Sequence, residues 1–407
     1  MRQQEDGMSI YSQKQLEKYA EALIWGLTTS RPGFRKYDTI QLRFDVAALD
    51  LVEILYGRLI RMKFNVLLKM LPTPSLELDL YAGTDKAQRG FLFAGDKEFW
   101  NSINGDIYIH APASLTHLKD VPSANLADIS RTKSVLRDIR IRNEDKGLAG
   151  WTMCTYPTEE LARNAGLSLK EYSRQIAKAC FLDEKDPAKK WREIFRNSGM
   201  IKKWLASLDI NTIRTESGSM DLEVRLGEKR QFLGVSGQNI PSFEIFTSPD
   251  RRGTKGVYYA NFPSFREGNY VKGVRLEFRD GRAVKITAEQ GERFVKGTLA
   301  TDRGAGQVGE FSLTDTRFSK IDKFMADTLF DENHGGKHGN CHIAVGFSYS
   351  DTYTGNIAKL TPALKEKLGY NSSAVHWDLV NTEDKKVTVT LKNGKKVTIY
   401  EKGQFKY

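Results

Sequence analysis

Residues 39–71 read TIQLRFDVAALDLVEILYGRLIRMKFNVLLKML, and their pattern sets the architecture expected for the first half of the chain. Residues 40–44 alternate apolar and polar side chains, as a half-buried strand does. Apolar residues at helical spacing follow, and we expect Asp45 to cap that helix. The apolar run at residues 64–71 predicts a second strand. Strand, helix and strand with short joins form a βαβ unit, which requires parallel strands and a right-handed crossover.

The segments around this unit extend the alternation of helices and strands. Ser12 and Gln15 form a capping box ahead of an amphipathic helix, and residues 106–112 resemble another strand. A further helix is expected to start at Ser168. We therefore expect an N-terminal Rossmann-like α/β domain in residues 1–200. It lacks a GxGxxG fingerprint, so nothing in it indicates a dinucleotide.

The second half of the chain has a different pattern. After about residue 208, short alternating runs such as residues 222–226 predict strands. Asp280-Gly281 and Asn393-Gly394 predict type I′ hairpin turns between such strands. We therefore expect a β-rich, mostly antiparallel C-terminal domain in residues 201–407. The predicted fold class is α/β for the first domain and α+β for the second.

Length and composition indicate an ordinary globular protein. The chain has 407 residues, of which 40% are hydrophobic and 28% are charged, and one core rarely serves a chain of this length. Its three cysteines are widely spaced and form no CxxC pair, so neither a disulfide framework nor a cysteine zinc site is indicated. Residues 1–7 are polar, unlike a signal peptide, and no apolar run is long enough to span a membrane. We therefore expect a cytoplasmic location.

The net charge of +11 comes from 62 Lys and Arg against 51 Asp and Glu. The basic residues are spread along the chain and mixed with acids, and the densest run, residues 385–396, alternates with Val and Thr like the solvent face of a hairpin. Net charge alone affects solubility and weak association. Nucleic acid is therefore not expected as the main partner.

Histidine is scarce and unevenly placed. Four of the six histidines fall between residues 334 and 376, and histidine is the commonest metal ligand near neutral pH. His376 and Asp378 point to one face if they lie in a strand, which suits two ligands of one ion. The alternative is a half-buried strand that turns two polar side chains to solvent.

A glycine-rich loop leads into an apolar strand that starts at His342. We expect His334 and His338 to be solvated in an exposed loop. Cys341 would face the opposite side of the strand from His342, so we expect it to pack rather than to bind metal.

Two glutamates lie in segments punctuated by glycine and proline, which we expect to be turns. Glu244 has apolar neighbours, and a carboxylate there is costly unless it is paired, metal-bound or turned to solvent. Glu310 follows the glycine-rich run of residues 304–309. Neither glutamate stands out as a ligand by its local sequence alone.

Four motifs in order change this assessment: NIPSFEIFTSPD (239–250), GEFSL (309–313), DEN…CHIAVGFSY (331–349) and HWDL (376–379). Together they resemble the M29 family of metallo-aminopeptidases, including the tyrosine seven residues after the histidine of the third motif. The region from Trp151 onward also resembles this family, whereas the match before about residue 140 is faint.

The resemblance implies the site residues. The positions that match the family's metal ligands are Glu244, Glu310, His342, His376 and Asp378. Glu310 matches the carboxylate that bridges the metals, and Tyr349 matches a tyrosine beside the cluster, so these two residues are the expected catalytic groups. Glu332 resembles a further carboxylate ligand. The extra residues 334–339 separate it from His342, and its position relative to the metals depends on how they fold.

The resemblance also implies a function. A donor set of carboxylates and imidazoles without thiolate suits divalent Zn, Co, Mn or Mg, and two such ions 3.5–4 Å apart would activate water. We expect a dinuclear metallo-aminopeptidase that hydrolyses the N-terminal bond of short peptides, as a homodimer.

Two alternatives remain open. One is a mononuclear iron ring-cleaving dioxygenase of the same superfamily, with His342, His376 and Asp378 as the metal-binding triad. The presence of both Glu244 and Glu310 favours two metals and hydrolysis instead. The other alternative is a basic binding protein without enzymatic activity, whose sign would be salt-dependent binding of nucleic acid.

Overall fold

The computed structural model describes residues 10–407, which form two compact units. Among the described residues, the first unit contains residues 10–117, 121–191 and 237–240, and the second contains residues 118–120, 192–236 and 241–407. The division falls inside helix α9 (Pro187–Ser207), and the short strand β7 (Asn239–Ile240) belongs to the first unit. The polar segment at residues 1–7 lies outside the described residues.

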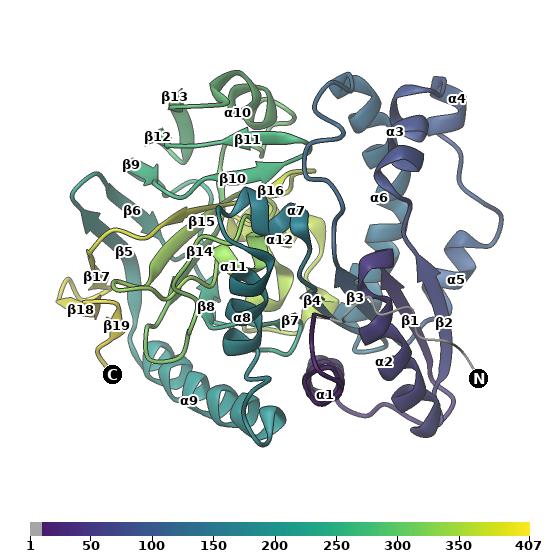
Figure 1. Ribbon diagram of the computed structural model, residues 1–407. Helices are drawn as coiled ribbons and strands as arrows, with labels where there is room; N and C mark the ends of the chain where they lie inside the picture. Colours follow the sequence, from purple (N-terminus) through teal and green to yellow (C-terminus); the bar gives the residue numbers. More distant parts are fainter. Residues whose placement is uncertain (1–9) are drawn as a thin grey trace, which may run out of the picture. The chain divides into compact units, whose positions relative to one another are not determined.

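The first unit is built on a five-stranded parallel sheet (Figure 1). Its strand order is β2-β1-β3-β4-β7, from β1 (Thr39–Phe44), β2 (Asn65–Met70), β3 (Gly105–His110), β4 (Gly150–Thr155) and β7. The βαβ unit predicted at residues 39–71 is therefore confirmed. The apolar side chains of β1 are buried, as is typical of a parallel sheet whose faces are covered by helices.

Helices surround this sheet. Helices α1 and α2 contact each other, and together they contact all five strands. Helix α6 contacts α3, α4 and α5. The helices of the first unit are α1 (Gln13–Ser30), η1 (Val46–Ala48), α2 (Leu49–Arg61), α3 (Pro74–Ala82), α4 (Lys86–Arg89), α5 (Asp96–Ser102), α6 (Ser123–Asp145), α7 (Glu159–Asn164) and α8 (Leu169–Ala179).

Two of the three helix starts predicted in this unit are capped by the predicted side chain, and one is not. The capping boxes at Ser12 and Ser168 are both formed, as predicted. Asp45 occupies the N-cap position of the 3₁₀ turn η1, but its side chain makes no capping hydrogen bond, so that part of the prediction is wrong: its Oδ2 accepts a hydrogen bond from the backbone amide of Ala111 at 2.7 Å instead. The carboxylate links the ends of two adjacent strands, and a 3₁₀ turn starts α2 instead.

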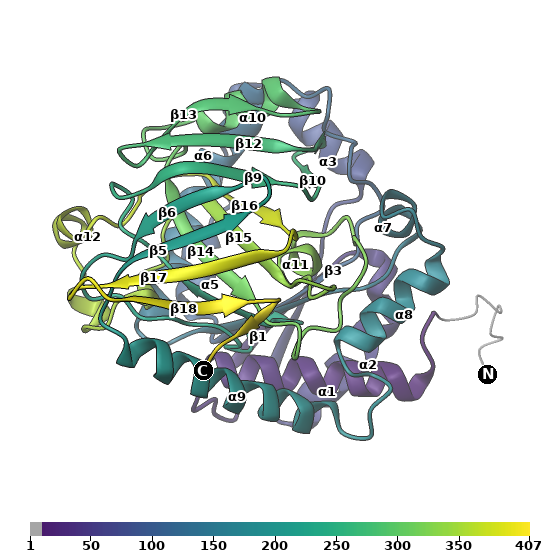
Figure 2. The ribbon, with the colours of Figure 1, turned by 90° about the vertical axis from the view of Figure 1, so that its left-hand side faces the viewer.

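The second unit contains a large antiparallel sheet, whose strands lie side by side in Figure 2. The strand order is β13-β12-β9-β6-β5-β17-β18-β19. These strands are β5 (Ile210–Ser217), β6 (Asp221–Arg225), β9 (Lys255–Ala260), β12 (Val274–Arg279), β13 (Arg282–Thr287), β17 (Lys385–Leu391), β18 (Lys396–Glu401) and β19 (Gln404–Phe405). The β-rich, antiparallel character predicted for this part of the chain is confirmed.

A second antiparallel sheet of four strands has the order β16-β15-β14-β8. Its strands are β8 (Glu244–Thr247), β14 (Val308–Thr314), β15 (Asn340–Gly346) and β16 (His376–Asn381). The unit also contains the hairpin of β10 (Ser264–Arg266) and β11 (Asn269–Val271), the helices α10 (Glu292–Leu299), α11 (Thr328–Asp331) and α12 (Pro362–Leu368), and the 3₁₀ turns η2 (Ser350–Thr352) and η3 (Ile357–Lys359).

The two predicted hairpin turns differ in outcome. Asp280 and Gly281 have φ of 47° and 78°, as a type I′ turn requires. At the second turn only Gly394 has positive φ, and the amide of Gly394 donates to the carbonyl of Leu391. The loop has three residues with its glycine in the left-handed region, so the type I′ prediction is wrong for Asn393-Gly394.

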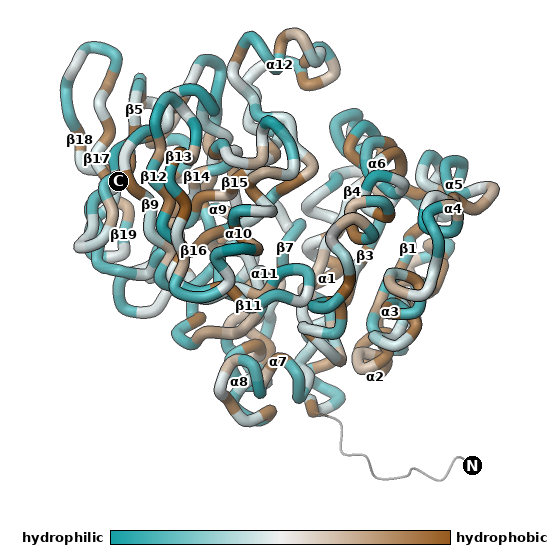
Figure 3. Tube along the Cα trace, turned by 90° about the horizontal axis from the view of Figure 1, so that it is seen from above, coloured by the Kyte–Doolittle hydropathy of each residue, from teal (hydrophilic) through white to brown (hydrophobic). Residues whose placement is uncertain are grey.

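The core of the second unit contains apolar side chains from both of its sheets. Leu276 and Val389 of the large sheet belong to the same buried cluster as Ile343 and Leu379 of the small sheet. In Figure 3, hydrophobic segments of the chain, coloured brown, lie along strands of this unit. Cys341 belongs to this cluster and is fully buried, which confirms its predicted packing role. Within residues 10–407, no helix combines the length and apolar composition needed to cross a bilayer.

Candidate metal centre

The small sheet of the second unit has one apolar face and one polar face. Alternate residues of β15, such as Cys341 and Ile343, belong to the buried core, so His342 and Ala344 face the other way. Directly paired residues of adjacent strands share a face. Ala344 pairs with Glu310 on one side and with Asp378 on the other. The polar face therefore brings together residues from separate strands.

All five residues that matched the family's ligands lie on this face. His376 is paired with Gly346 of β15, and Glu244 with Thr314 of β14. Glu244 and Glu310 therefore belong to strands β8 and β14, and the expectation that they lie in turns is wrong. The glycine and proline residues lie mainly in the segments before the two strands. Glu244 begins β8 and Glu310 lies inside β14, and each strand pairs with a strand far away in the sequence.

His342 lies at the centre of the cluster. Its Nε2 is 3.2 Å from Glu310 Oε1, 3.3 Å from Glu244 Oε2 and 3.9 Å from Asp378 Oδ1. His376 Nε2 is 3.9 Å from the other oxygen of Glu310 and 3.6 Å from Asp378 Oδ1. The two oxygens of Glu310 thus face different histidines. This confirms that His376 and Asp378 share one face, and they face the cluster rather than open solvent.

The cluster is buried, and burial changes the acidity of its groups. Glu310 is 4% exposed, and its removal from water raises the pKa of its carboxyl to about 7. His342 is fully buried. Burial alone lowers the pKa of its ring, but the hydrogen bonds to Glu244 and Glu310 outweigh burial and raise it. Several acids crowded around one imidazole in a dry site require a compensating positive charge.

Neighbouring polar groups orient both imidazole rings. His342 Nδ1 lies 3.4 Å from Asn340 Oδ1, and His376 Nδ1 lies 3.0 Å from the carbonyl oxygen of Phe347. Each Nε2 is therefore left to face the carboxylates, as metal-binding histidines require. The hydroxyl of Ser312 donates to Glu244 Oε2 at 3.2 Å. Sequence reasoning missed Ser312 and Asn340, although each lies two residues from a candidate ligand in its strand.

Glu332 is placed beside this cluster despite the inserted residues. It is buried at the end of α11, and burial together with the charges of Glu244 and Asp378 raises its pKa. The side-chain amide of Asn340 donates to its carbonyl oxygen at 2.9 Å, and the hydroxyl of Thr314 donates at 3.3 Å. Both donors come from strands of the small sheet, which fixes this segment to the sheet that carries the candidate ligands.

The two histidines of the insertion have different environments. The ring of His334 is 8% exposed and lies edge-on to Phe262 with ring centroids 4.7 Å apart, so the expectation that it is solvated is wrong. Burial lowers its pKa to about 4. His338 is partly exposed, with Nδ1 3.4 Å from Asp384 Oδ1. Neither histidine joins the cluster. The insertion folds inward because the amides of Gly335 and Gly336 both donate to the carbonyl of Ile321.

Tyr349 follows β15 and lies at the rim of the cluster. Its ring centroid is 4.9 Å from that of His376, and the residue is 38% exposed. It is therefore the one sequence-predicted site residue that is substantially accessible.

A cation fits the central residues. One ligand atom each from Glu244, Glu310 and His342 lie within 4.8 Å of one another. The donors are carboxylate oxygen and imidazole nitrogen, which suit divalent ions such as Zn and Mn. The nearest cysteine, Cys341, faces the core, so no thiolate enters this donor set.

Comparison with known proteins agrees with this geometry. A family model described as thermophilic metalloprotease (M29) matches residues 12–405. The chain belongs to the M29 metalloprotease family. The resemblance seen in its motifs is confirmed by this match across nearly the whole chain.

Individual relatives of this M29 member are aminopeptidases by name. It is 29% identical to Aminopeptidase T of Thermus aquaticus over 63% of each chain, and so spans under two thirds of that relative. It is 24% identical to Aminopeptidase PepS of Streptococcus thermophilus over 96% of this chain and 97% of that one. The solved structure of AmpT from Thermus thermophilus superposes with a TM-score of 0.79 at 23% identity, covering 97% and 99% of the two chains. That likeness establishes a shared fold.

Proposed function

We propose that this chain is a metallo-aminopeptidase that hydrolyses the N-terminal bond of short peptides. The observation that best supports this proposal is the position of Glu310. Its Oε1 lies 3.2 Å from His342 Nε2, and its Oε2 lies 3.9 Å from His376 Nε2. A carboxylate that faces two imidazoles suits the bridging position of a two-metal site. The residues that would hold the metals are Glu332 and five residues of the small sheet. All of them lie in residues 201–407, which therefore contain the proposed catalytic domain.

The proposed cofactors are two divalent ions per chain, from among Zn, Co, Mn and Mg. Glu310 would bridge them, with the other ligands divided between the two ions: Glu244, His342, His376, Asp378 and Glu332. When bound, such a pair lowers the pKa of water and polarises a carbonyl group. The hydrogen bonds from Ser312 and to Asn340 hold Glu244 and His342 in place for this role.

The exposed group at the rim acts on the substrate. Burial and the nearby carboxylates of Glu310 and Asp378 raise the pKa of the Tyr349 phenol above its ordinary value, so the phenol is protonated at neutral pH. It can donate a hydrogen bond to the peptide carbonyl oxygen as negative charge develops there. Glu310 and Tyr349 are therefore the proposed catalytic residues, one by holding the reacting groups together and the other by stabilising charge.

The oxygenase alternative is less well supported. An iron triad would use His342, His376 and Asp378, yet Glu244 lies 3.3 Å from His342 and supplies a further donor that a triad does not need. None of the relatives named above is an oxygenase. One iron per chain with ring-cleaving activity would support this alternative.

We also propose that the protein is a cytoplasmic homodimer. Its three cysteines are buried and form no disulfide, which suits a reducing compartment. Edge strand β2 exposes Leu67 and Leu68, which point to opposite faces of the sheet, at 46% and 47%. Exposed apolar side chains on an edge strand favour pairing with another chain. Light scattering at several concentrations would measure the oligomeric state.

The function is tested with aminoacyl p-nitroanilides. The metal-loaded protein should release nitroaniline from substrates with a free amine, lose this activity with a chelator, and regain it with Co, Mn or Zn. The same anilides with an acetylated amine are the matched control and should not be cleaved. Cleavage of the blocked substrates at equal rate, or no cleavage of any free-amine substrate with any of these metals, would reject the proposal.

A further inference from the structure

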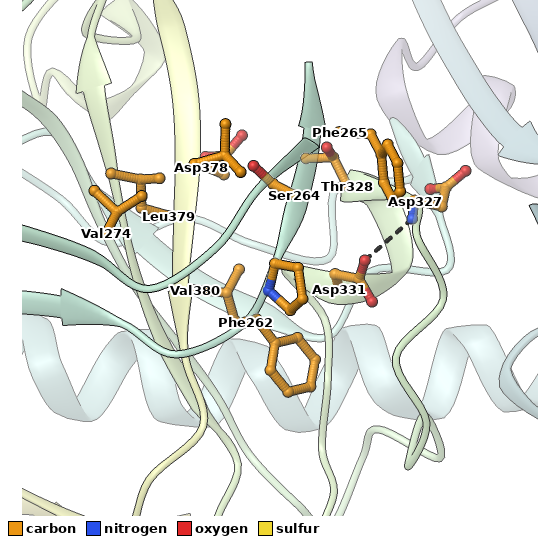
Figure 4. Close-up of a pocket in the computed structure, with 12 residues that line it drawn as sticks. Phe262, Ser264, Phe265, Val274, Asp327, Thr328, Asp331, Asp378, Leu379 and Val380 are labelled. Atoms are coloured by element: carbon orange, nitrogen blue, oxygen red, sulfur yellow. Dashed lines mark hydrogen bonds between the residues drawn. The ribbon is translucent and has the colours of Figure 1, made fainter. Parts of the chain in front are cut away.

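A small cavity has Asp378, one of the proposed ligands, in its wall (Figure 4). Its walls come from β16, from residues 262–265, from Val271 of β11 and Val274 of β12, and from Asp327 and α11. The space open to a water-sized sphere is about 10 Å³. A cavity of this size holds one water-sized group.

The position of this cavity relates it to the substrate. Asp378, one of the proposed ligands, forms part of its wall, and Asp331 in the same wall directly precedes Glu332. In an aminopeptidase substrate, a single α-carbon separates the free amine from the carbonyl that is attacked. The side chain on that carbon must therefore lie next to the metal ligands. A larger groove on the outer face of the eight-stranded sheet contains none of the proposed ligands.

The walls of the cavity are mainly apolar, and one of its three acids is held in place. Phe262, Phe265 and Val380 present hydrocarbon to the space. The carboxylate of Asp331 accepts hydrogen bonds from the backbone amides of Met325 and Asp327, at 2.8 and 3.0 Å, so it is held in place. Apolar walls favour a short aliphatic side chain.

We propose that this cavity receives the side chain of the substrate's N-terminal residue and restricts it to alanine, serine or glycine. This rests on the aminopeptidase function proposed above. A methyl or hydroxymethyl group is close to water in size and fills the space. Leucine and phenylalanine carry several more carbons and require a wall to move. Phe265 of the β10–β11 hairpin contributes a large ring to the wall of the cavity. Because this ring limits the size of the side chain that fits, Phe265 is then a specificity-determining residue.

The experiment compares two variants of the full-length, metal-loaded protein. Phe265→Ala removes a ring that lines the cavity. Tyr270→Ala removes the ring that pairs with Phe265 across the hairpin, with centroids 5.1 Å apart, but does not line the cavity. Both variants lose the same aromatic contact, so a general loosening of the hairpin affects both alike. The readout is the ratio of kcat/KM for leucyl to alanyl p-nitroanilide.

The wild-type protein should prefer alanyl over leucyl anilide. Phe265→Ala should raise the leucyl-to-alanyl ratio by about tenfold or more, and Tyr270→Ala should change it by less than about twofold. Equal or better cleavage of leucyl anilide by the wild type, or equal ratios in the two variants, would overturn the inference while leaving the aminopeptidase function intact. Failure to cleave any free-amine anilide would reject both.

Discussion

Glu310 of β14 and His342 of β15 lie diagonally across the small sheet, and their Oε1 and Nε2 atoms are 3.2 Å apart. The strand register pairs Glu310 with Ala344 and Ser312 with His342. The small side chain of Ala344 thus lies between the two charged strand positions Glu310 and Asp378. This pairing, rather than any local motif, brings together the carboxylate and imidazole groups between which a cation fits.

Glu310→Gln should remove most of the peptidase activity. Glutamine keeps the shape of the side chain but cannot supply two anionic oxygens to two ions. We expect kcat/KM for a free-amine anilide to fall by at least about 100-fold. This is more than the loss that is typical when a residue that only supports a metal ligand is changed. Unfolding in urea should show a stable protein, because the substitution removes a buried acid that resists ionisation. Full activity in a well-folded Glu310→Gln variant would reject the bridging role.

Ser312→Ala tests the support of Glu244. The hydroxyl donates to Glu244 Oε2 at 3.2 Å, so its loss should weaken metal affinity by about 10–100-fold. Competition with a fluorescent chelator measures this affinity. Thr388→Ala, on the outer face of the large sheet, is the control and should bind metal like the wild type. Equal affinities in both variants would mean that Ser312 does not position the ligand.

The Cys341→Ser variant tests whether Cys341 packs in the core or binds a metal. The thiol is fully buried in the apolar core, so a hydroxyl there should lower the free energy of unfolding by about 1–3 kcal/mol. Metal content by elemental analysis should stay at the wild-type level. Loss of metal from the folded variant would instead place Cys341 in the donor set.

Much of this site could be predicted from alternation alone. The period of two along a strand correctly placed His376 and Asp378 on one face, and Cys341 and His342 on opposite faces. The same reasoning could not place Glu244 or Glu310, because their faces depend on pairing between strands far apart in sequence. Only the order of motifs singled them out, through resemblance to a family.

Other departures have similar causes. Asp45 has the sequence of a helix cap, yet the neighbouring strand offers its carboxylate the amide of Ala111. His334 lies in a glycine-rich segment that is typical of exposed loops, yet hydrogen bonds to Ile321 fold the segment inward against Phe262. In both cases a tertiary partner outweighs the local preference, and that partner cannot be identified from one sequence.

The buried ring of His334 predicts a pH dependence of stability. Its pKa is about 4 in the folded chain and near 6.5 when unfolded. Between these values the unfolded chain binds the additional proton, so the free energy of unfolding should fall as pH is lowered from about 6.5 to 4. This residue contributes up to about 3 kcal/mol to that fall. Urea titrations of wild type and His334→Gln at pH 7 and 4.5 measure it. A variant with the same pH dependence as the wild type would contradict the assignment.

The most direct test of the account is anomalous scattering from crystals grown with Mn or Zn. The account predicts two peaks per chain, about 3.5–4 Å apart, with Glu310 between them and with His342 and His376 on different ions. A single peak held by the two histidines and Asp378 alone, or strong peaks only elsewhere in the chain, would contradict it.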